Sequence, residues 1–469
     1  MKILFIFPIP RIPIFGKVLF NLGIGYLSAI LKQHRHKTDL LTLNNYDRQK
    51  IKQKIKTFSP DLIAMSSTSD QIGLSRQIIS YIKNNFQLPI VLGGVHATYL
   101  PQESIAIEGL LGICLGEGEY PLLELVECLE KGKDHRHISN FWFREGDEII
   151  KNDLRPLVIN LDSLPFPDRE VFDIPEINKA WFVGMQFMGS RGCLYSCTNC
   201  NTPSFRKIYK LGKENYVRLR SVDNLLAEID SVIKRYKFGG YVAFEDDSFV
   251  VDKNWLREFS SKYSKAIRYP FFCNARADQI DEESISLLKN ANCRLIRVGI
   301  ESGDEYLRNV ILRKGITNND IVKTFQLAKK YGIKALSFNM LGLPFETEEL
   351  IRKTVKLNQE VRPDFIALSY FRPYPGTDLY NLCKENNLIS RRKASHWLED
   401  TILDQPTVSK NTVRYYMRLF RAYVCGSNIM PLIKLTARLY IWKNFTLFDF
   451  MKGTKDSIKN HFMKNNQQV

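Results

Sequence analysis

Short apolar runs alternate with helical patterns along the first 135 residues, and this alternation limits the fold more than any other feature. The apolar runs lie at residues 2–9, 38–43, 61–67, 89–94 and 112–115, and the helical patterns at 22–33, 51–58, 74–84 and 122–131. Continuous apolar runs are typical of strands that are buried on both faces. Strands joined by helices form parallel sheets, so residues 1–140 are predicted to be a flavodoxin-like, Rossmann-type α/β domain.

A second alternating region begins near residue 182 and contains six further apolar runs. An eight-stranded parallel barrel needs about 250 residues, and the region is shorter than that, so a partial (β/α)6 TIM-type barrel is predicted over residues 182–392. The prolines of residues 141–181 indicate a small hairpin followed by an extended linker. Residues 393–469 are predicted to be a basic helical extension.

The charge is strongly basic and unevenly distributed. Lys plus Arg exceeds Asp plus Glu by 67 − 50 = 17, and residues 391–469 carry 14 basic against 5 acidic residues. A solvated basic face explains this, as does contact with anionic lipid, nucleic acid or an acidic partner. The first residues, MKILFIFPIP, contain no small-residue cleavage site. We therefore expect a cytoplasmic protein that can contact the inner face of the membrane.

Three of the nine cysteines lie together in the sequence GSRGCLYSCTNC, as Cys193, Cys197 and Cys200. Thiolates are soft ligands for iron–sulfur clusters and for zinc. A structural zinc site needs four protein ligands, and no fourth cysteine or histidine lies close in sequence. Three thiolates on a cubane cluster leave one iron open to another ligand. A zinc site completed by a distant residue, or three unrelated cysteines, are the alternatives.

Small or turn-forming residues follow the predicted strands of the first domain. In parallel sheets ligands bind beyond the carboxyl ends of the strands. Ordinary turns explain any one of these positions, but together they predict a binding crevice. Its candidate residues are Ser66, Ser67, Gly93, Gly94, Gly116 and Glu117.

The motif CLYSCTNC resembles the cluster-binding motif of the radical SAM superfamily. Further signatures resemble the cobalamin-binding branch of that family: FEDDSF, NARAD, GIESG, LGLPFET and PYPGT in the second region. LGIGYLSAIL, VLGGVHATYLPQ and GEGEYPLLEL in the first region resemble its cobalamin (B12)-binding domain. The resemblance covers about residues 1–390.

The resemblance implies three cofactors: a [4Fe–4S] cluster on Cys193, Cys197 and Cys200, S-adenosylmethionine on the open iron, and cobalamin. It implies that Glu245, Asp246 and Asp247 accept from the ammonium group of S-adenosylmethionine and that Arg276 pairs with its carboxylate. Glu301 would hold the ribose and Gly342 would approach the adenine. The crevice residues would surround the nucleotide tail and corrin edge of cobalamin. No histidine follows the first strand, so cobalamin is expected without a histidine lower ligand, and His34, His36 and His96 are not expected to bind cobalt.

The family chemistry is reductive cleavage of S-adenosylmethionine to a 5′-deoxyadenosyl radical, and in this branch often methylation of an unactivated carbon. Methylation of a small-molecule or lipid-like metabolite is the first expectation, with a reductant such as flavodoxin or ferredoxin as partner. Ring formation or rearrangement is the alternative within the same architecture. A basic, zinc-containing nucleic-acid-binding protein is the alternative from another class, although nucleic acid is not the expected partner.

Overall fold

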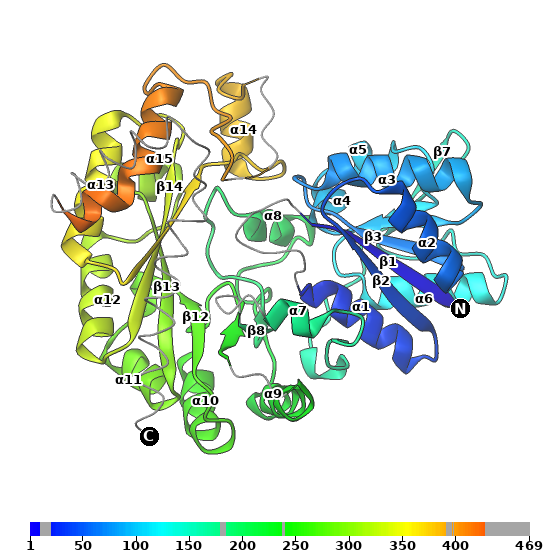
Figure 1. Ribbon diagram of the computed structural model, residues 1–469, viewed down its shortest axis with the longest axis horizontal. Coiled ribbons are helices and arrows are strands. Elements are labelled where there is room, and N and C mark those ends of the chain that lie inside the picture. The colour runs from blue at the N-terminus through cyan, green and yellow to red at the C-terminus, as the bar shows by residue number, and fades with distance from the viewer. Residues whose placement is uncertain (10–19, 179–183, 237–239, 391–395, 397, 427–469) are drawn as a thin grey trace.

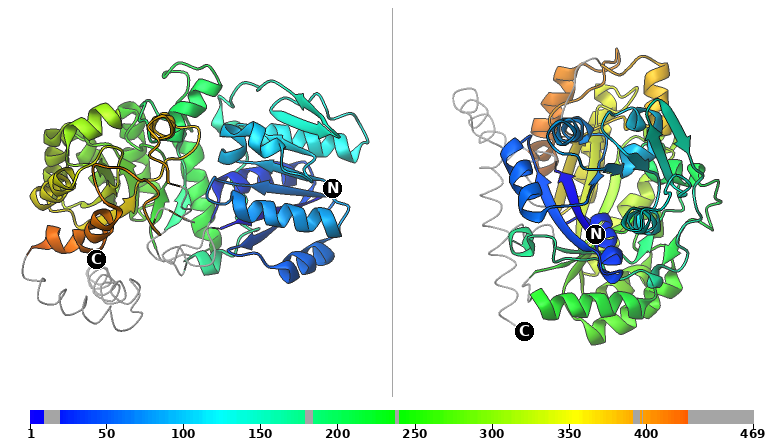
Figure 2. Two further views of the ribbon diagram at one scale, coloured as in Figure 1. Left: turned by 90° about the horizontal axis from the view of Figure 1, so that it is seen from above. Right: turned by 90° about the vertical axis from the view of Figure 1, so that its right-hand side faces the viewer.

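A computed structural model describes residues 1–9, 20–178, 184–236, 240–390, 396 and 398–426, and it contains two α/β domains (Figure 1). The N-terminal domain lies at one end of the long axis and the second domain at the other, with helix α8 (Asn201–Ile208) between them. The left view of Figure 2 shows the same separation. One apolar core runs through both sheets, because the linker residues Phe172, Ile174 and Ile177 belong to it.

The N-terminal sheet has seven strands in the order β2-β1-β3-β4-β5-β6-β7. Strands β1 to β5 are parallel, and their order 2-1-3-4-5 is the flavodoxin-like one. The predicted hairpin, β6 and β7, extends this sheet by antiparallel pairing on β5. The strands are β1 (Lys2–Pro8), β2 (Lys37–Leu43), β3 (Leu62–Ser66), β4 (Ile90–Gly93), β5 (Gly112–Cys114), β6 (Phe141–Glu145) and β7 (Glu148–Lys151).

Helices cover both faces of this sheet, which is why its inner strands β1, β3 and β4 are almost entirely apolar. Along β1, Ile3, Phe5 and Phe7 pack in the core on one face, while Leu4 and Ile6 pack in the core on the other. The helices are α1 (Leu22–Gln33), α2 (Arg48–Phe58), α3 (Ile72–Asn85), α4 (Val95–Tyr99), α5 (Pro101–Ile105) and α6 (Glu119–Glu130).

The second domain is a six-stranded parallel sheet in the order β15-β14-β13-β12-β11-β8, as the partial barrel prediction requires. Within the described part of the chain, β8 and β15 do not pair with each other, so the barrel is open. The strands are β8 (Met185–Phe187), β11 (Val242–Phe244), β12 (Phe271–Ala275), β13 (Cys293–Glu301), β14 (Lys334–Leu341) and β15 (Phe365–Tyr370).

Five helices connect these strands and lie along the outer side of the sheet (Figure 1). They begin at polar caps that the sequence supplies: the side chain of Asp252, for example, accepts from the Trp255 backbone N–H. The helices are α9 (Val222–Tyr236), α10 (Lys253–Ala266), α11 (Glu282–Asn290), α12 (Asn318–Lys330) and α13 (Glu348–Val361).

The basic extension is described only as far as residue 426. Its helix α15 (Lys410–Cys425) packs Val413, Tyr416 and Phe420 against the core beside α13. The rest of the predicted helical extension lies outside the described residues. In the described ranges, none of the helices combines the length and the apolar character needed to cross a lipid bilayer.

Candidate cofactor site

The three cysteines lie on a loop between β9 (Ser190–Arg191) and α8. Gly192 opens the loop with φ +96°, and a Cβ there would lie 2.6 Å from the Tyr216 carbonyl oxygen, so the turn has no room for a side chain. Cys200 closes the loop as the N-cap of α8, where its Sγ accepts from the Thr202 backbone N–H at 3.4 Å. The sequence therefore fixes both ends of the cysteine loop.

Thr198, between the second and third cysteines, attaches the loop to the partial barrel. Its backbone N–H donates to the Leu312 carbonyl at 2.9 Å and its hydroxyl to the Ile311 carbonyl at 2.6 Å. The Leu379 backbone N–H donates to the Thr198 carbonyl at 2.9 Å. These contacts hold the cysteines at the mouth of the barrel, where parallel barrels place their active sites.

The cysteine thiols suit an iron–sulfur cluster as a donor set. All three are free and half-buried, and burial raises the pKa of the Cys193 thiol to about 11. The Cys193 thiol therefore becomes a ligand only when a metal displaces its proton. No three His, Cys, Asp or Glu side chains in the described ranges are placed to share one metal ion. A cubane makes no such demand, because each thiolate binds a different iron.

The acidic residues after β11 face three different partners. Glu245 pairs with the Arg297 guanidinium at 2.9 Å. The Asp246 carboxylate is buried, and it accepts from the Gly189 backbone N–H and the Ser190 hydroxyl. Asp247 accepts from the hydroxyl of Thr202, two residues after Cys200, at 3.3 Å. Asp247 thus lies beside the cysteine loop. The Asp246 carboxylate instead binds Gly189 and Ser190, which precede that loop in the sequence.

Arg276 also reaches the cysteine loop. Its guanidinium lies over the Tyr195 ring, 3.2 Å from the centroid, and one of its nitrogens is 3.7 Å from the Cys197 Sγ. Asp278 pairs with the same guanidinium at 3.0 Å. These contacts hold Arg276 against the loop.

Glu301 and Gly342 both end strands with a left-handed backbone. Glu301 has φ +65° at an irregularity in the pairing of β13 with β14, and its carboxylate pairs with the Lys314 ammonium at 3.0 Å. Gly342 has φ +79°, and its N–H donates to the buried carboxyl of Glu346 at 2.6 Å. Such strained positions cluster at ligand sites, because they turn the chain sharply at the end of a strand.

A cavity of about 310 Å³, here called the second cavity, opens at the barrel mouth. Glu301 lines it, together with Asn199 from the cysteine loop, so the cavity connects the predicted ribose ligand with the cluster site. Most of its wall is apolar and comes from β14, β15 and the chain that follows β15. These residues are Phe338, Asn339, Met340, Ala367, Leu368, Ser369, Tyr370, Phe371, Arg372 and Tyr374.

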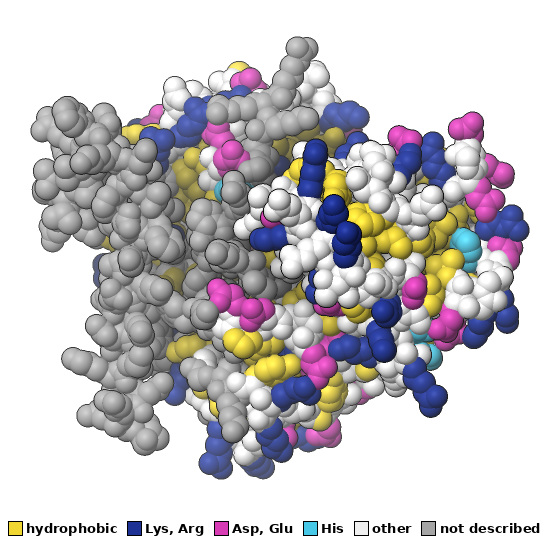
Figure 3. All heavy atoms as spheres, turned by 45° about the vertical axis from the view of Figure 1, so that its right-hand side comes forward, with side chains coloured by type: hydrophobic (Ala, Val, Ile, Leu, Met, Phe, Trp, Pro, Cys, Tyr) yellow, Lys and Arg dark blue, Asp and Glu magenta, His cyan; other side chains and the backbone are white. Residues whose placement is uncertain are grey.

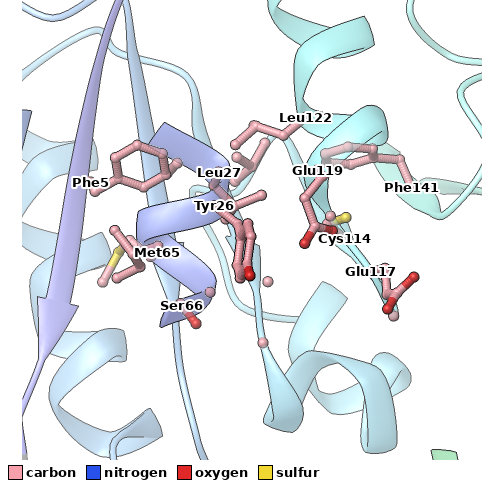
Figure 4. Close-up of a pocket in the computed structure, with 18 of the residues that line it drawn as sticks. Phe5, Tyr26, Leu27, Met65, Ser66, Cys114, Glu117, Glu119, Leu122 and Phe141 are labelled. Atoms are coloured by element: carbon pink, nitrogen blue, oxygen red, sulfur yellow. The ribbon is translucent and has the colours of Figure 1, made fainter. Parts of the chain in front are cut away.

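A cavity of about 280 Å³, here called the first cavity, lies at the carboxyl ends of the N-terminal strands (Figure 4). It brings together five of the six predicted crevice residues: Ser66, Gly93, Gly94, Gly116 and Glu117. The sixth, Ser67, is buried beside it and hydrogen-bonds with Ser75.

The first cavity is apolar on one side and polar on the other. Figure 4 shows the side chains of Phe5, Leu122 and Phe141 on the side opposite the Ser66 hydroxyl and the Glu117 carboxylate. At Gly94, with φ +92°, a Cβ would lie 2.8 Å from the Ser66 Oγ, so the backbone itself forms the wall. An apolar slot with a polar mouth and glycine walls fits the nucleotide tail of cobalamin better than a compact polar ligand.

None of the residues that line the first cavity is a histidine. His96 is buried elsewhere, with its ring nitrogen 3.1 Å from the Ser69 hydroxyl, and burial lowers its pKa. His34 and His36 lie near Glu127 and Glu130 on α6. The absence of a histidine lower ligand stays a prediction.

Sequence reasoning missed the residues that join the two domains. Arg191 and Arg218 pair with Glu117, Arg372 pairs with Asp70 at 2.7 Å, and the Tyr374 hydroxyl donates to the same Asp70 at 3.3 Å. Burial raises the pKa of Glu117, but the two arginines outweigh it and the net shift is downward. The sequence shows Arg191 and Arg218 on either side of the cysteine motif, but it does not show that both pair with Glu117.

Gly116 shows how tightly the domains fit. It has φ +72°, and a Cβ there would lie 1.9 Å from the Tyr209 hydroxyl of the other domain. We expect Gly116→Ala to destabilise the protein by about 2–4 kcal/mol, combining backbone strain with overpacking. Thermal unfolding monitored by circular dichroism measures this change.

Gly132 supplies a matched control, because it has φ +61° and no atom within 4 Å of a built Cβ. Gly132→Ala should lower the free energy of unfolding by about 1 kcal/mol, which is the cost of placing alanine in a left-handed backbone conformation. Adding Tyr209→Ala to Gly116→Ala should recover part of the loss. Equal destabilisation by the two alanines would contradict the interdomain contact.

The fold and the site together define a class: a flavodoxin-like cofactor domain followed by a partial barrel with a three-cysteine loop at its mouth. The family model "Radical SAM superfamily" matches residues 188–357, and the model "B12 binding domain" matches residues 15–126. The chain is therefore a radical SAM superfamily protein with an N-terminal B12-binding domain. The cofactors of this pair of domains are a [4Fe–4S] cluster, S-adenosylmethionine and cobalamin. The radical SAM match includes the three cysteines, and this favours an iron–sulfur cluster over zinc.

Several known proteins are similar along most of their length. The uncharacterized methyltransferase PH0819 of Pyrococcus horikoshii is 27% identical, over 82% of each chain. The anaerobic magnesium-protoporphyrin IX monomethyl ester cyclase of Rubrivivax gelatinosus is 23% identical, over 76% of this chain and 65% of its own. The radical S-adenosylmethionine methyltransferase TsrM of Kitasatospora setae shares the fold, with a TM-score of 0.69, 17% identity, and 88% and 81% of the two chains covered.

Proposed function

We propose that this protein is a cobalamin-dependent radical SAM enzyme that methylates an unactivated carbon of a small-molecule or lipid-like metabolite. The observation that carries the proposal is the position of the cysteine loop, which contributes Asn199 to the second cavity and adjoins Arg191 of the first. Each cavity adjoins the carboxyl ends of one parallel sheet. Methyltransferase similarity in sequence and in fold supports the same reaction.

When bound, the cluster supplies the electron that cleaves S-adenosylmethionine to the 5′-deoxyadenosyl radical, and cobalamin supplies the methyl group. The chain's own residues bind and orient these groups. We assign the cluster to Cys193, Cys197 and Cys200, and the ribose to Glu301 in the second cavity. Gly342 brings backbone close to the adenine. Asp247 is the candidate for the ammonium group, because the Asp246 carboxylate is engaged by Gly189 and Ser190 and the Glu245 carboxylate by Arg297.

In the first cavity the apolar wall of Phe5, Leu122 and Phe141 takes the base of the cobalamin tail, and Ser66 with the glycine backbone takes its polar groups. A cavity of about 280 Å³ would hold only part of the cofactor, so its residues would hold the tail and the corrin ring would extend beyond them. Substrate then binds between the ring and the second cavity. The two domains flank this space, which lets the protein exclude water and oxygen from the radical.

Product analysis tests the proposal. The full chain, reconstituted anaerobically with iron, sulfide and hydroxocobalamin and then supplied with S-adenosylmethionine and a reductant, should form both 5′-deoxyadenosine and S-adenosylhomocysteine. The second product arises only when the methyl group leaves S-adenosylmethionine. A cyclase, which the similarity to the Rubrivivax gelatinosus enzyme favours, would form 5′-deoxyadenosine alone. Formation of neither product would reject both reactions.

The nucleic-acid-binding alternative has less support. Among the described side chains on the face that Figure 3 turns forward, basic and acidic groups are interleaved with apolar ones, so these side chains form no field of one sign. Nucleic-acid binding needs a continuous basic footprint. The basic excess of the chain lies instead toward its C-terminus, with 14 − 5 = 9 of the net 17 charges in residues 391–469.

We assign that basic extension to anionic lipid at a membrane surface. In the described part, α15 carries Arg418 and the half-exposed ring of Tyr415 on its outer side, a combination that suits the lipid–water interface. Sedimentation with anionic liposomes, with and without residues 405–469, tests this contact, and unchanged binding rejects it.

The electron that reduces the cluster comes from a partner protein of the flavodoxin or ferredoxin kind.

A further inference from the structure

The cysteine loop belongs to a segment that leaves the barrel domain and returns to it. We call residues 191–218 the cysteine segment. Its two ends meet in the short antiparallel pair of β9 and β10 (Arg218–Leu219), in which Arg191 lies opposite Arg218. The loop, α8 and Tyr209 all lie between these ends. Whatever holds the paired arginines therefore holds the base of the cluster site.

One carboxylate of the N-terminal domain binds both arginines. Glu117 Oε1 lies 2.9 Å from Arg191 Nη1, and Glu117 Oε2 lies 2.9 Å from Arg218 Nη1. The Val158 backbone N–H donates to Glu117 Oε2 at 3.0 Å. Glu119 completes the group by pairing with Arg191 at 2.6 Å. Two arginines and two glutamates thus balance their charges across the domain boundary.

This group of four is almost fully buried. The side chains of Arg191 and Glu117 are each 13% exposed, and those of Glu119 and Arg218 are 6% and 5% exposed. A buried charge that loses its partner is strongly destabilised, so these residues move together or not at all. The segment has a further link to the N-terminal domain, since the Tyr99 hydroxyl donates to the Asn201 carbonyl at 2.6 Å.

The same residues line the first cavity. Glu117, Glu119 and Arg191 all contribute to its wall, and the Arg191 guanidinium lies 4.8 Å from the centroid of the Tyr26 ring, another wall residue. A ligand in the first cavity therefore contacts the group that fixes the cysteine segment. At its other side the segment contributes Asn199 to the second cavity.

We propose that Glu117, gripping Arg191 and Arg218, is a positioning residue that couples the first cavity to the cysteine segment, so that cobalamin and S-adenosylmethionine bind cooperatively. This inference rests on the proposed function, which supplies the two ligands. A ligand that orders Glu117 orders the segment, and the second ligand then binds to a loop already in place. The coupling is reciprocal, because each ligand must change the affinity of the other by the same factor.

The test measures the Kd of S-adenosylmethionine on cluster-loaded protein, with and without saturating hydroxocobalamin. Anaerobic equilibrium dialysis with radiolabelled S-adenosylmethionine, without a reductant so that the ligand is not cleaved, reports the binding. We expect hydroxocobalamin to tighten binding by about tenfold in the natural protein. Glu117→Gln keeps the shape and removes the charge, and should bring this ratio close to one. Arg191→Lys keeps the charge but loses the two-pronged geometry, and should give an intermediate ratio.

Glu124→Gln is the matched control. Glu124 also forms an ion pair with an arginine, Arg155, at 2.5 Å, but that arginine lies outside the cysteine segment. It should leave the ratio unchanged. A natural protein that binds both ligands independently, or a Glu117→Gln variant that retains the full ratio, overturns the coupling alone. A protein that binds neither ligand overturns the proposed function instead. An intermediate ratio in Arg191→Lys, together with an unchanged melting temperature, separates positioning from a general loss of stability.

Discussion

Replacing Cys193, Cys197 and Cys200 together by alanine should yield a folded protein that retains almost no iron and forms no 5′-deoxyadenosine. Loss of supporting residues around a metal site already weakens binding by 10–100-fold, so loss of all three ligands should weaken it by about 100-fold or more. The fold should persist because the three side chains are half-buried on a loop, outside the apolar cores. Iron per protein, visible absorbance and circular dichroism measure the three expectations.

A control variant carries Cys128→Ala and Cys425→Ala, since both cysteines are free and lie outside the cysteine segment. It should bind iron and form 5′-deoxyadenosine like the natural protein. Single alanines at the three cluster positions should each lower iron content, because a cubane held by two thiolates loses a protein ligand on a second iron. Full iron retention in the triple variant would exclude the cluster site and, with it, the proposed reaction.

The strands could be predicted because their signal is local. Residues 3–7 of β1 face two different cores and are all apolar, so the run is visible without knowledge of its neighbours. Helix α1 was predicted over the residues it occupies, since Asn21 caps it and the polar residues after Gln33 end it. The short helices α4 and α5 were missed because five residues carry too little periodicity.

The site could be predicted only in part. The cysteine spacing is local and identifies the loop, and the turns after β3, β4 and β5 identify the first cavity. Which carboxylates are already engaged depends on residues far away in sequence. Glu117 looks like a cofactor ligand in the sequence, but its partners, Arg191 and Arg218, follow it by 74 and 101 positions. The domain boundaries and the individual cofactor ligands stay predictions.

Glu346, in the turn after β14, should make the protein less stable as the pH rises toward 8. The carboxyl is fully buried and its oxygen Oε2 accepts from the backbone N–H groups of Gly342 and Leu343. Burial raises its pKa from 4.5 to about 8, and the two hydrogen bonds offset this only in part. Because the folded pKa is the higher one, its contribution to stability is complete below pH 4.5 and is lost as the pH rises to about 8.

The loss should be large, because a difference of about 3.5 pKa units corresponds to about 5 kcal/mol. Glu346→Gln keeps a carbonyl acceptor for both N–H groups and cannot ionise. Its melting temperature should therefore vary less with pH, and above pH 8 it should exceed that of the natural protein by several degrees. Scanning calorimetry of both proteins between pH 5 and pH 9 measures the difference in slope.

Glu349→Gln is the control, since its side chain is 79% exposed on the first turn of α13, and its pH profile should follow that of the natural protein. The turn held by Glu346 includes Gly342, which we assign to the adenine of S-adenosylmethionine. If ionisation of Glu346 loosens that turn, affinity for S-adenosylmethionine should fall between pH 7 and pH 9 in the natural protein and stay constant in Glu346→Gln. Parallel pH profiles for the two proteins would show that this carboxyl titrates in the ordinary range and that the turn is held by other contacts.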